Sequence, residues 1–597
     1  MRCRLLALVS LLASAPLVSA GVPAFFAPAE PSGRLLVRLY PMENVTPGSS
    51  RLVTFGVPFP RGSVTPAALA KVRVLDGGSE VPAHVDNLTP WRHATNPAID
   101  GQSVRVARIQ IHHTFAASYP SFESVEVEWG LSDRQQNVPA LESPRNGWHL
   151  VSSGTFVAAD GVSEPDVYAV LSRAVLSKGV LRPMRTHPGD RRVPDTRSDP
   201  AVMDATEHWP DFLEQEHAAK NNFFPLINQD DPAVTAPNQC PYKTAYEPWL
   251  YDRASSFFVL YLRTGFLRPL REAVRAAEFY RTQLWPAGTN PPNAVGAFKL
   301  KVPDPAGYIG GNGAMYSYDE CLAYLHWIAG DQVAAQAIPW IVSAHEANDE
   351  PTRWSPGLGG WTERHTAFRL LANAVAYEVT GNTTYRASLL SQAGDFIWHQ
   401  NGAAGQLPAG RVDGGLYHYG SQHGDGTPNE LVASSWMTAL TGDAMVRAYA
   451  MTEDPAVGHF VRRLGTFERA ATKTDANHPY TYGPLAYPDY MMRWDGASDV
   501  RDGSEAEHAL EVASTLAWAS YFGELLGPTD PTLKQAAEDL YFTYDIGVNH
   551  WIRPAGPASG LPAYRVSPWR KYGWEHRAST SLSWLIGDLI LKDGFED

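Results

Sequence analysis

Residues 361–400 have the pattern of two helices joined by a tight turn, and this feature constrains the fold most. Phe368, Leu371 and Val375 recur at three- and four-residue steps, the spacing that places apolar side chains on one helix face. The pattern stops at Thr380-Gly381-Asn382, where glycine can take the left-handed conformation that ends a helix. A second helical run follows at once and reaches Gln400. We therefore expect two antiparallel helices, a helical hairpin.

The same arrangement repeats through the C-terminal part of the chain. Helical runs from Tyr246 onward meet at short turns, which are Thr264-Gly265, Ala329-Gly330-Asp331, Thr380-Gly381-Asn382, Thr452-Glu453-Asp454-Pro455 and Gly527-Pro528-Thr529-Asp530-Pro531. A last helix from Glu575 and a partner around 201–220 would complete six pairs. The spacing is too irregular for a consensus solenoid. We predict an (α/α)6 toroid, and an open helical superhelix is the alternative.

The N-terminal part has a period of two, which predicts β-strands. Apolar and polar residues alternate in five stretches, 36–40, 51–55, 71–75, 103–111 and 122–129. Asp76-Gly77-Gly78 has the composition of a hairpin turn between strands. The fold class we predict is therefore multidomain β + α, an N-terminal antiparallel β domain followed by the toroid.

Part of this β region resembles a known family. The segments that carry the likeness are Gly56-Val57-Pro58-Phe59-Pro60-Arg61-Gly62, Val74-Leu75-Asp76 before Glu80-Val81-Pro82, and Gly101-Gln-Ser-Val-Arg105. They resemble the N-terminal barrel domain of exo-rhamnogalacturonan-lyase-like proteins. The chain departs from that family at Trp91-Arg92, where the family has Trp-Pro-Asp-Gly-Ser. The resemblance implies a β domain joined to an (α/α) toroid that cleaves a glycan by elimination, and it assigns no catalytic residue.

The N-terminus has the features of a secretory signal. Met1-Arg-Cys-Arg is followed by an apolar run, and Val18-Ser19-Ala20 fits the small-x-small rule for cleavage. We expect a secreted or periplasmic protein with no membrane span. Without Cys3, the cysteines Cys240 and Cys321 remain, and pairing or two separate buried thiols are equally open. The expected divisions are 1–20 signal peptide, 21–135 β-barrel-like domain, 136–200 second β segment and linker, 201–592 toroid, and 593–597 tail.

Charge and aromatic content point to a carbohydrate partner. The formal net charge of −14 argues against nucleic acid, and it leaves any anionic substrate dependent on local Arg, Lys and His. The long loops opposite the short turns are rich in rings and glycine, in the runs 308–316, 357–361, 414–423, 480–490 and 569–574. Rings of this kind stack on the apolar faces of sugars. We expect these loops to converge on an acidic polysaccharide or oligosaccharide.

Elimination at a uronic acid needs a cation for the carboxylate, a base for the C5 proton and an acid for the leaving oxygen. Arg, His and Tyr supply these groups. The predicted catalytic residues are His423 as base and Tyr419 as acid, with His365 and Tyr482 as further candidates. The predicted substrate-binding residues are Tyr316, Trp361, Arg364, Tyr417, His418, Glu507, His508, Trp574 and Arg577.

Two other functions stay open. A glycoside hydrolase would need a pair of carboxylates, with Asp319, Glu363, Glu507 and Glu575 as the candidates. A non-catalytic glycan-binding protein would keep the aromatic loops alone. We predict no cofactor. His112 and His113 are adjacent in a strand and face opposite ways, and the acids at Asp230-Asp231 and Asp425 lack the spacing of a calcium loop.

Overall fold

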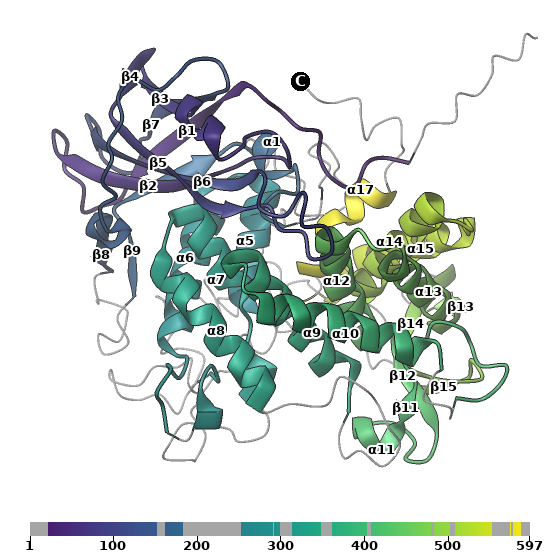
Figure 1. The fold of residues 1–597 in the computed structure, drawn as a ribbon. Helices are drawn as coiled ribbons and strands as arrows, with labels where there is room; N and C mark the ends of the chain where they lie inside the picture. Colours follow the sequence, from purple (N-terminus) through teal and green to yellow (C-terminus); the bar gives the residue numbers. More distant parts are fainter. Residues whose placement is uncertain are drawn as a thin grey trace, which may run out of the picture.

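The computed structural model describes residues 22–151, 162–182, 185, 252–290, 292–298, 313–347, 361–402, 407–478, 483–501, 508–551, 574 and 577–586. Antiparallel strands come first in the chain and paired helices follow, as the sequence predicts (Figure 1). Two predicted features, the signal peptide and the helix at 201–220, lie outside the described residues, as does Cys240. Cys321 is a buried free cysteine.

Two antiparallel sheets form the N-terminal β region. The larger has the order β10–β1–β7–β3–β4, with β1 at Gly33–Pro41, β3 at Arg73–Asp76, β4 at Ser79–Val81, β7 at Glu123–Trp129 and β10 at Val167–Leu171. The smaller has the order β2–β6–β5, with β2 at Ser50–Pro58, β5 at Ala83–Pro90 and β6 at Val104–Thr114. A short pair, β8 (Trp148–Leu150) and β9 (Ser163–Pro165), and helix α1 (Arg173–Leu176) complete it.

The period-two pattern is observed in β1 and fails in β6. In β1, Val37 and Leu39 are buried whereas Leu36 and Arg38 are exposed. In β6, both faces are buried over most of the strand, and Arg105 and Arg108 are among the buried residues. The reason is that the second face of the smaller sheet lies against helix α7 (Glu320–Ala329), where the guanidinium of Arg105 lies 4.3 Å from the ring centroid of Trp327.

The predicted hairpins are present. Their helices are α5 (Arg253–Thr264) with α6 (Leu267–Thr282), α7 with α8 (Gln332–Ala347), α9 (Glu363–Thr380) with α10 (Thr383–Gln400), α12 (Ser435–Thr452) with α13 (Pro455–Ala471), and α14 (Ala509–Leu526) with α15 (Pro531–Trp551). Gly265, Gly330 and Gly381 take the left-handed conformation in the first three turns. Helix α17 (Leu582–Ile586) follows near the C-terminus.

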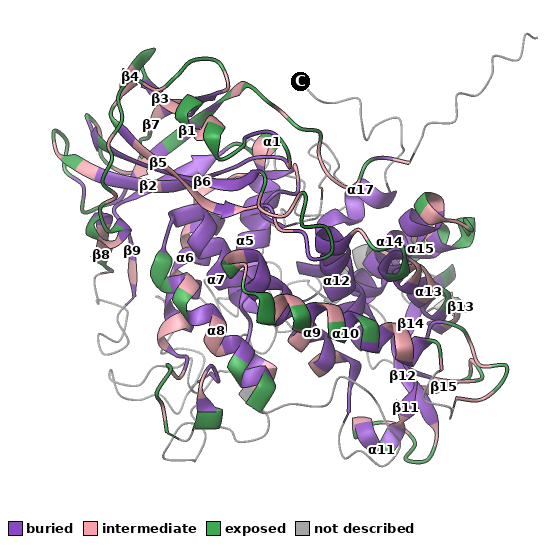
Figure 2. Ribbon diagram, viewed as in Figure 1, coloured by how far each residue is buried: buried purple, intermediate pink, exposed green. Residues whose placement is uncertain are grey.

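The helices form an inner and an outer series. Every residue of α12 is buried, whereas α13 exposes one face (Figure 2). The inner series is α5, α7, α9, α12, α14 and α17, in which each helix contacts the next. Its two ends also meet, because Arg577 before α17 lies 3.3 Å from Asp252 at the start of α5. Helix α9 is therefore buried nearly all round, not only along the predicted stripe.

The β region covers the end of the helices that carries the short turns. A side chain placed at Gly330 would contact Thr54 and Arg108, and one placed at Gly381 would contact Arg92. Glu453 in the fourth turn forms an ion pair with Arg61. The opposite end, which we call the long-loop end, carries the starts of the inner helices, and Figure 1 shows helix α11 (Gly420–His423) far from the β region.

A small sheet that the sequence analysis did not predict stands at the long-loop end. Its strands are β11 (His418–Tyr419), β12 (Leu431–Ser434), β13 (Thr472–His478), β14 (Gly483–Arg493) and β15 (Ser498–Arg501), all antiparallel. Part of the run 480–490, expected to be a loop, is strand β14. Among the helices of the described residues, none has the length and apolar character needed to cross a bilayer.

Candidate active site

The first turns of the inner helices meet around Trp436. The ring of Trp436, in the first turn of α12, lies 4.8 Å from that of His508 and 5.4 Å from that of Trp574, and both are nearly parallel to it. Tyr490 of β14 lies 5.9 Å away. We call these residues, together with Arg364, His365, His423 and Asp425, the rim cluster. Residues far apart in the sequence thus converge at one end of the helices.

Arg364 is the cation of the rim cluster. It is half-buried in the first turn of α9, with its guanidinium carbon 5.7 Å from the ring centroid of Trp436 and 5.9 Å from that of Trp574. Its Nη2 donates to Nε2 of His365 at 3.2 Å and contacts the sulfur of Met315 at 3.9 Å. Within the described part of the chain, no carboxylate forms an ion pair with Arg364. A half-buried guanidinium without a counter-charge is suited to bind an anion.

The bond from Arg364 also indicates which role Nε2 of His365 plays. A guanidinium donates hydrogen bonds and accepts none. Nε2 of His365 therefore accepts this hydrogen bond through its lone pair.

Asp425 links His423 to Tyr490. Oδ2 of Asp425 accepts a hydrogen bond from the Tyr490 hydroxyl at 3.3 Å and lies 3.5 Å from Nδ1 of His423. Burial, helped by the neighbouring His418, Arg364 and His365, lowers the pKa of His423 to about 3. Burial and the charge of Asp425 raise the pKa of Tyr490. At neutral pH the imidazole of His423 is unprotonated and the Tyr490 phenol keeps its proton.

Three predicted substrate-binding side chains belong to the protein interior. Trp361 is fully buried against the rings of His399 and His418. Tyr417 is also buried and donates its hydroxyl to the carbonyl of Val412 at 2.9 Å. Tyr316 is 6% exposed, and its carbonyl accepts from Tyr280. The prediction that these three contact a sugar is wrong, because they leave no surface for one.

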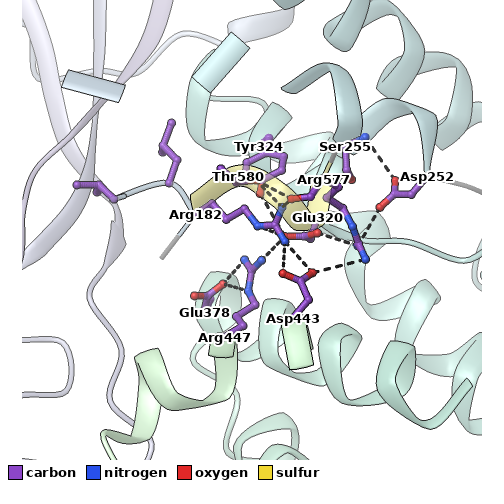
Figure 3. A network of polar contacts seen from close by, with 12 residues as sticks. Arg182, Asp252, Ser255, Glu320, Tyr324, Glu378, Asp443, Arg447, Arg577 and Thr580 are labelled. Carbon is purple, nitrogen blue, oxygen red and sulfur yellow. Dashed lines mark hydrogen bonds and ion pairs between the residues drawn. The ribbon is translucent and has the colours of Figure 1, made fainter. Parts of the chain in front are cut away.

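Arg577, the fourth such residue, is part of a buried ion network between the inner helices (Figure 3). Its Nη1 lies 3.0 Å from Glu320 and 3.3 Å from Asp252. Other members of the network are Arg105, Arg182, Glu378, Asp443 and Arg447. Every charge around Arg577 is thus already balanced, and the prediction that it binds substrate is wrong.

His508 and Trp574 form the buried side of the rim cluster and His418 lies next to it, since all three are at most 1% exposed. The imidazole of His418 stacks on His423 at 5.7 Å. We assign them no direct contact with a ligand. Tyr419 is half-buried, and its backbone N–H bonds the side chain of Gln422. Tyr482 and Glu507 lie outside the described residues.

Two of the carboxylates considered for hydrolysis, Glu363 and Asp319, are buried in the described part of the chain. Glu363 is fully buried and accepts from the backbone N–H of Ser434 at 3.0 Å. Asp319 is 2% exposed, and its burial raises its pKa. Glu507 and Glu575 lie outside the described residues.

Metal binding finds no support in the described ranges, which hold no group of three or more His, Cys, Asp or Glu suited to an ion. His112 and His113 bond different partners, Glu142 at 2.7 Å and Glu123 at 2.8 Å, as their opposite orientations predict. Asp230-Asp231 lies outside the described residues.

Three members of the rim cluster, Trp436, Tyr490 and Asp425, were not predicted to contact a sugar, and Asp425 was considered only as a calcium ligand. Tyr490 lies in the ring-rich run 480–490, where the sequence analysis chose Tyr482 instead. Trp436 stands in no glycine-rich loop, and only the position at a helix start, opposite the short turns, could have indicated it.

Comparisons with known proteins do not identify a family for this chain. No protein-family profile and no curated protein sequence matches the chain. Among solved structures, a sugar epimerase from a ruminal bacterium aligns with a TM-score of 0.38 at 12% identity, over 59% of this chain and 88% of the other. The cellobiose 2-epimerase from Spirochaeta thermophila aligns with a TM-score of 0.37 at 14% identity, over 56% and 86%. Likenesses this weak carry no argument about fold or chemistry.

Proposed function

We propose that the protein is a carbohydrate-active enzyme, a polysaccharide lyase that cleaves a uronate-containing glycan by β-elimination at the rim cluster. The observation that carries this proposal is Arg364, a half-buried guanidinium that has no carboxylate partner among the described residues and donates to Nε2 of His365. A protein with a net charge of −14 would gain a local cation there for an anionic sugar.

We infer that the helical part is an (α/α)6 toroid. In an open superhelix the first and last hairpins would lie far apart, whereas here Arg577 contacts Asp252. The segment 201–220 would supply the sixth outer helix. The long-loop end of such a ring brings the N-termini of all inner helices to one place, and the rim cluster lies there.

In the first step, the sugar carboxylate binds Arg364 and takes over the hydrogen bond now made to His365. The positive charge makes the C5 proton more acidic, because it stabilises the enolate that forms when that proton leaves. C5 is bonded to the carboxylate carbon, so the freed Nε2 of His365 would lie next to the C5 proton. Trp436 and Trp574 exclude water on one side of the guanidinium, which strengthens its attraction for the carboxylate.

In the second step, His365 removes the C5 proton and the electron pair of that bond forms the C4–C5 double bond. The C4–O bond breaks, and the leaving oxygen takes the proton of the Tyr490 hydroxyl. The raised pKa of Tyr490 keeps that proton available at neutral pH. Asp425, with a side chain that is 60% exposed, accepts from the phenol and orients it.

His423 is assigned a supporting role in this scheme, although it is the base that the sequence favours. Its two ring nitrogens face Met437 and Asp425, and its lowered pKa makes it a weak proton acceptor. His365 has Nε2 directed at Arg364, the group that would hold the carboxylate.

The test is incubation with a panel of uronate polymers (polygalacturonate, alginate, rhamnogalacturonan and hyaluronan) and with a neutral glucan. We expect ultraviolet absorbance from an unsaturated uronate with one of the acidic polymers, and none in the Arg364→Ala variant. Shorter products without that absorbance would identify a hydrolase instead. Binding without any product would identify a glycan-binding protein.

We also propose that the protein is exported after removal of residues 1–20. The N-terminal sequence of the protein recovered outside the cytoplasm would then begin at Gly21. An N-terminus at Met1 in that fraction would contradict it.

A further inference from the structure

His508 stands in a conformation that its side chain does not favour. Its φ is +66°, in the left-handed region that non-glycine residues rarely adopt. The residue precedes the first turn of α14, where a short polar side chain commonly caps the helix, yet the imidazole makes no capping hydrogen bond. Contacts other than a helix cap must therefore explain why a histidine occupies this position.

Those contacts are a buried carboxylate and a ring of the rim cluster. Nδ1 of His508 lies 2.6 Å from Oε2 of Glu511, which is fully buried. The imidazole also stacks on Trp436 with 11° between the planes. The left-handed backbone lets one side chain reach both partners. The pair with Glu511 holds the imidazole, and the imidazole covers the indole.

We propose that His508, oriented by Glu511, is a positioning residue that holds Trp436 against the guanidinium of Arg364. Its effect on a ligand passes through Trp436, because His508 itself is only 1% exposed. The kinetic part of this inference rests on the proposed function. The placement of Trp436 is a property of the protein without ligand and can be measured separately.

Glu468 offers a matched control. It is fully buried like Glu511, and burial together with the charges of Glu363 and Glu511 raises its pKa. Within the described part of the chain, Glu468 contacts no aromatic ring of the rim cluster. Among the contacts of the described residues, no hydrogen bond or ion pair joins Glu468 to His508 or Glu511, so Glu468→Gln changes a buried carboxyl in the same region and keeps both members of the pair.

The experiment is ¹⁹F NMR of the full chain labelled with 5-fluorotryptophan. The chain has 18 tryptophans, and the signal missing from Trp436→Phe identifies that of Trp436. We expect this signal to shift or broaden in His508→Asn, since asparagine tolerates the left-handed backbone but lacks the ring. It should stay in place in Glu468→Gln. The double variant His508→Asn/Glu511→Gln serves if the single one fails to fold, because it leaves no buried charge unpaired.

An unchanged Trp436 signal in both His508 variants would overturn the proposal, whatever reaction the protein catalyses. With a uronate polymer that the wild type cleaves, we expect KM in His508→Asn to rise about tenfold and kcat to stay within about twofold. A fall in kcat of about a hundredfold or more at constant KM would make His508 a catalytic residue and would also overturn it. If no uronate polymer is cleaved, the proposed function fails and the NMR result still decides the role of His508.

Discussion

The arginines of this protein work in two different settings, and the contrast separates stability from function. Between the inner helices, Arg182 lies 2.6 Å from Asp443, Arg447 donates to Glu378 at 2.9 Å, and each guanidinium has a carboxylate partner (Figure 3). At the rim, Arg364 has rings, a thioether and an imidazole as neighbours, and no carboxylate among the described residues. A paired buried charge holds segments in place, whereas an unpaired one retains its capacity to attract an anion.

The largest expected effect is loss of turnover at the rim. Arg364→Ala should lower kcat by about 10³–10⁴-fold on the uronate polymer that the wild type cleaves, because the carboxylate loses its counter-charge. The thermal midpoint should change little, since no ion pair to a described residue is lost. Arg364→Lys should recover only part of the rate, because an ammonium lacks the planar fork. Unimpaired turnover in Arg364→Ala would show that the unpaired arginine at the rim has no more part in catalysis than the paired arginines between the inner helices.

In the ion network we expect a substitution to lower stability more than it lowers turnover. Arg447→Met should lower the free energy of unfolding by about 3–5 kcal/mol, because Glu378 and Glu320 would remain as buried charges. Urea unfolding followed by circular dichroism measures the change. The double variant Arg447→Met/Glu378→Gln should lose less than Arg447→Met alone. A stable Arg447→Met protein with no turnover would show that the network acts in catalysis.

A third prediction uses pH. Burial opposes ionisation of Glu164, but hydrogen bonds and charges from Arg271 and Arg275 outweigh it and lower the pKa to about 2. A lowered acid pKa gives stability that is present above the unfolded value of 4.5 and is lost as the pH falls toward 2. The loss should be about 3 kcal/mol. Unfolding in urea at stepwise lower pH should show this slope in the wild type, and Glu164→Gln should flatten it.

Tyr490→Phe sharpens the assignment of the acid. It should lower kcat by about 10²-fold, because the leaving oxygen loses its proton donor. Tyr419→Phe is the matched control, and its rate should be near that of the wild type. The reverse result would return the role to Tyr419, as the sequence analysis favours.

The smallest effect is expected at Glu468 in acidic solution, because burial raises the pKa of this carboxyl. Well below the unfolded value of 4.5 the carboxyl is protonated in both the folded and the unfolded protein, so Glu468→Gln should change the unfolding free energy there by less than about 1 kcal/mol. A raised acid pKa also means that wild-type stability falls as the pH rises through that value, and the variant should lack this fall. A large loss of stability at neutral pH would show that the carboxylate is charged.

The sequence by itself determined the elements that depend on local patterns. The hairpin turns at Gly265, Gly330 and Gly381 were predictable because glycine readily takes the left-handed backbone conformation that ends a helix. The alternation in β1 was predictable because one sheet face lies on the core. The meeting of the inner-helix starts at one end followed from the alternation of short and long connections.

Only the tertiary structure decided which side chains at the converging loops keep a chemical role. Trp361, Tyr417 and Arg577 have the right residue types, but neighbours from distant segments use their rings and charges inside the protein. Trp436 and Tyr490 reach the rim through a helix start and a strand that no short motif marks. A charge or ring acts on a ligand only if the fold leaves it unsatisfied, and that depends on partners hundreds of residues away, such as the 325 positions between Arg577 and Asp252.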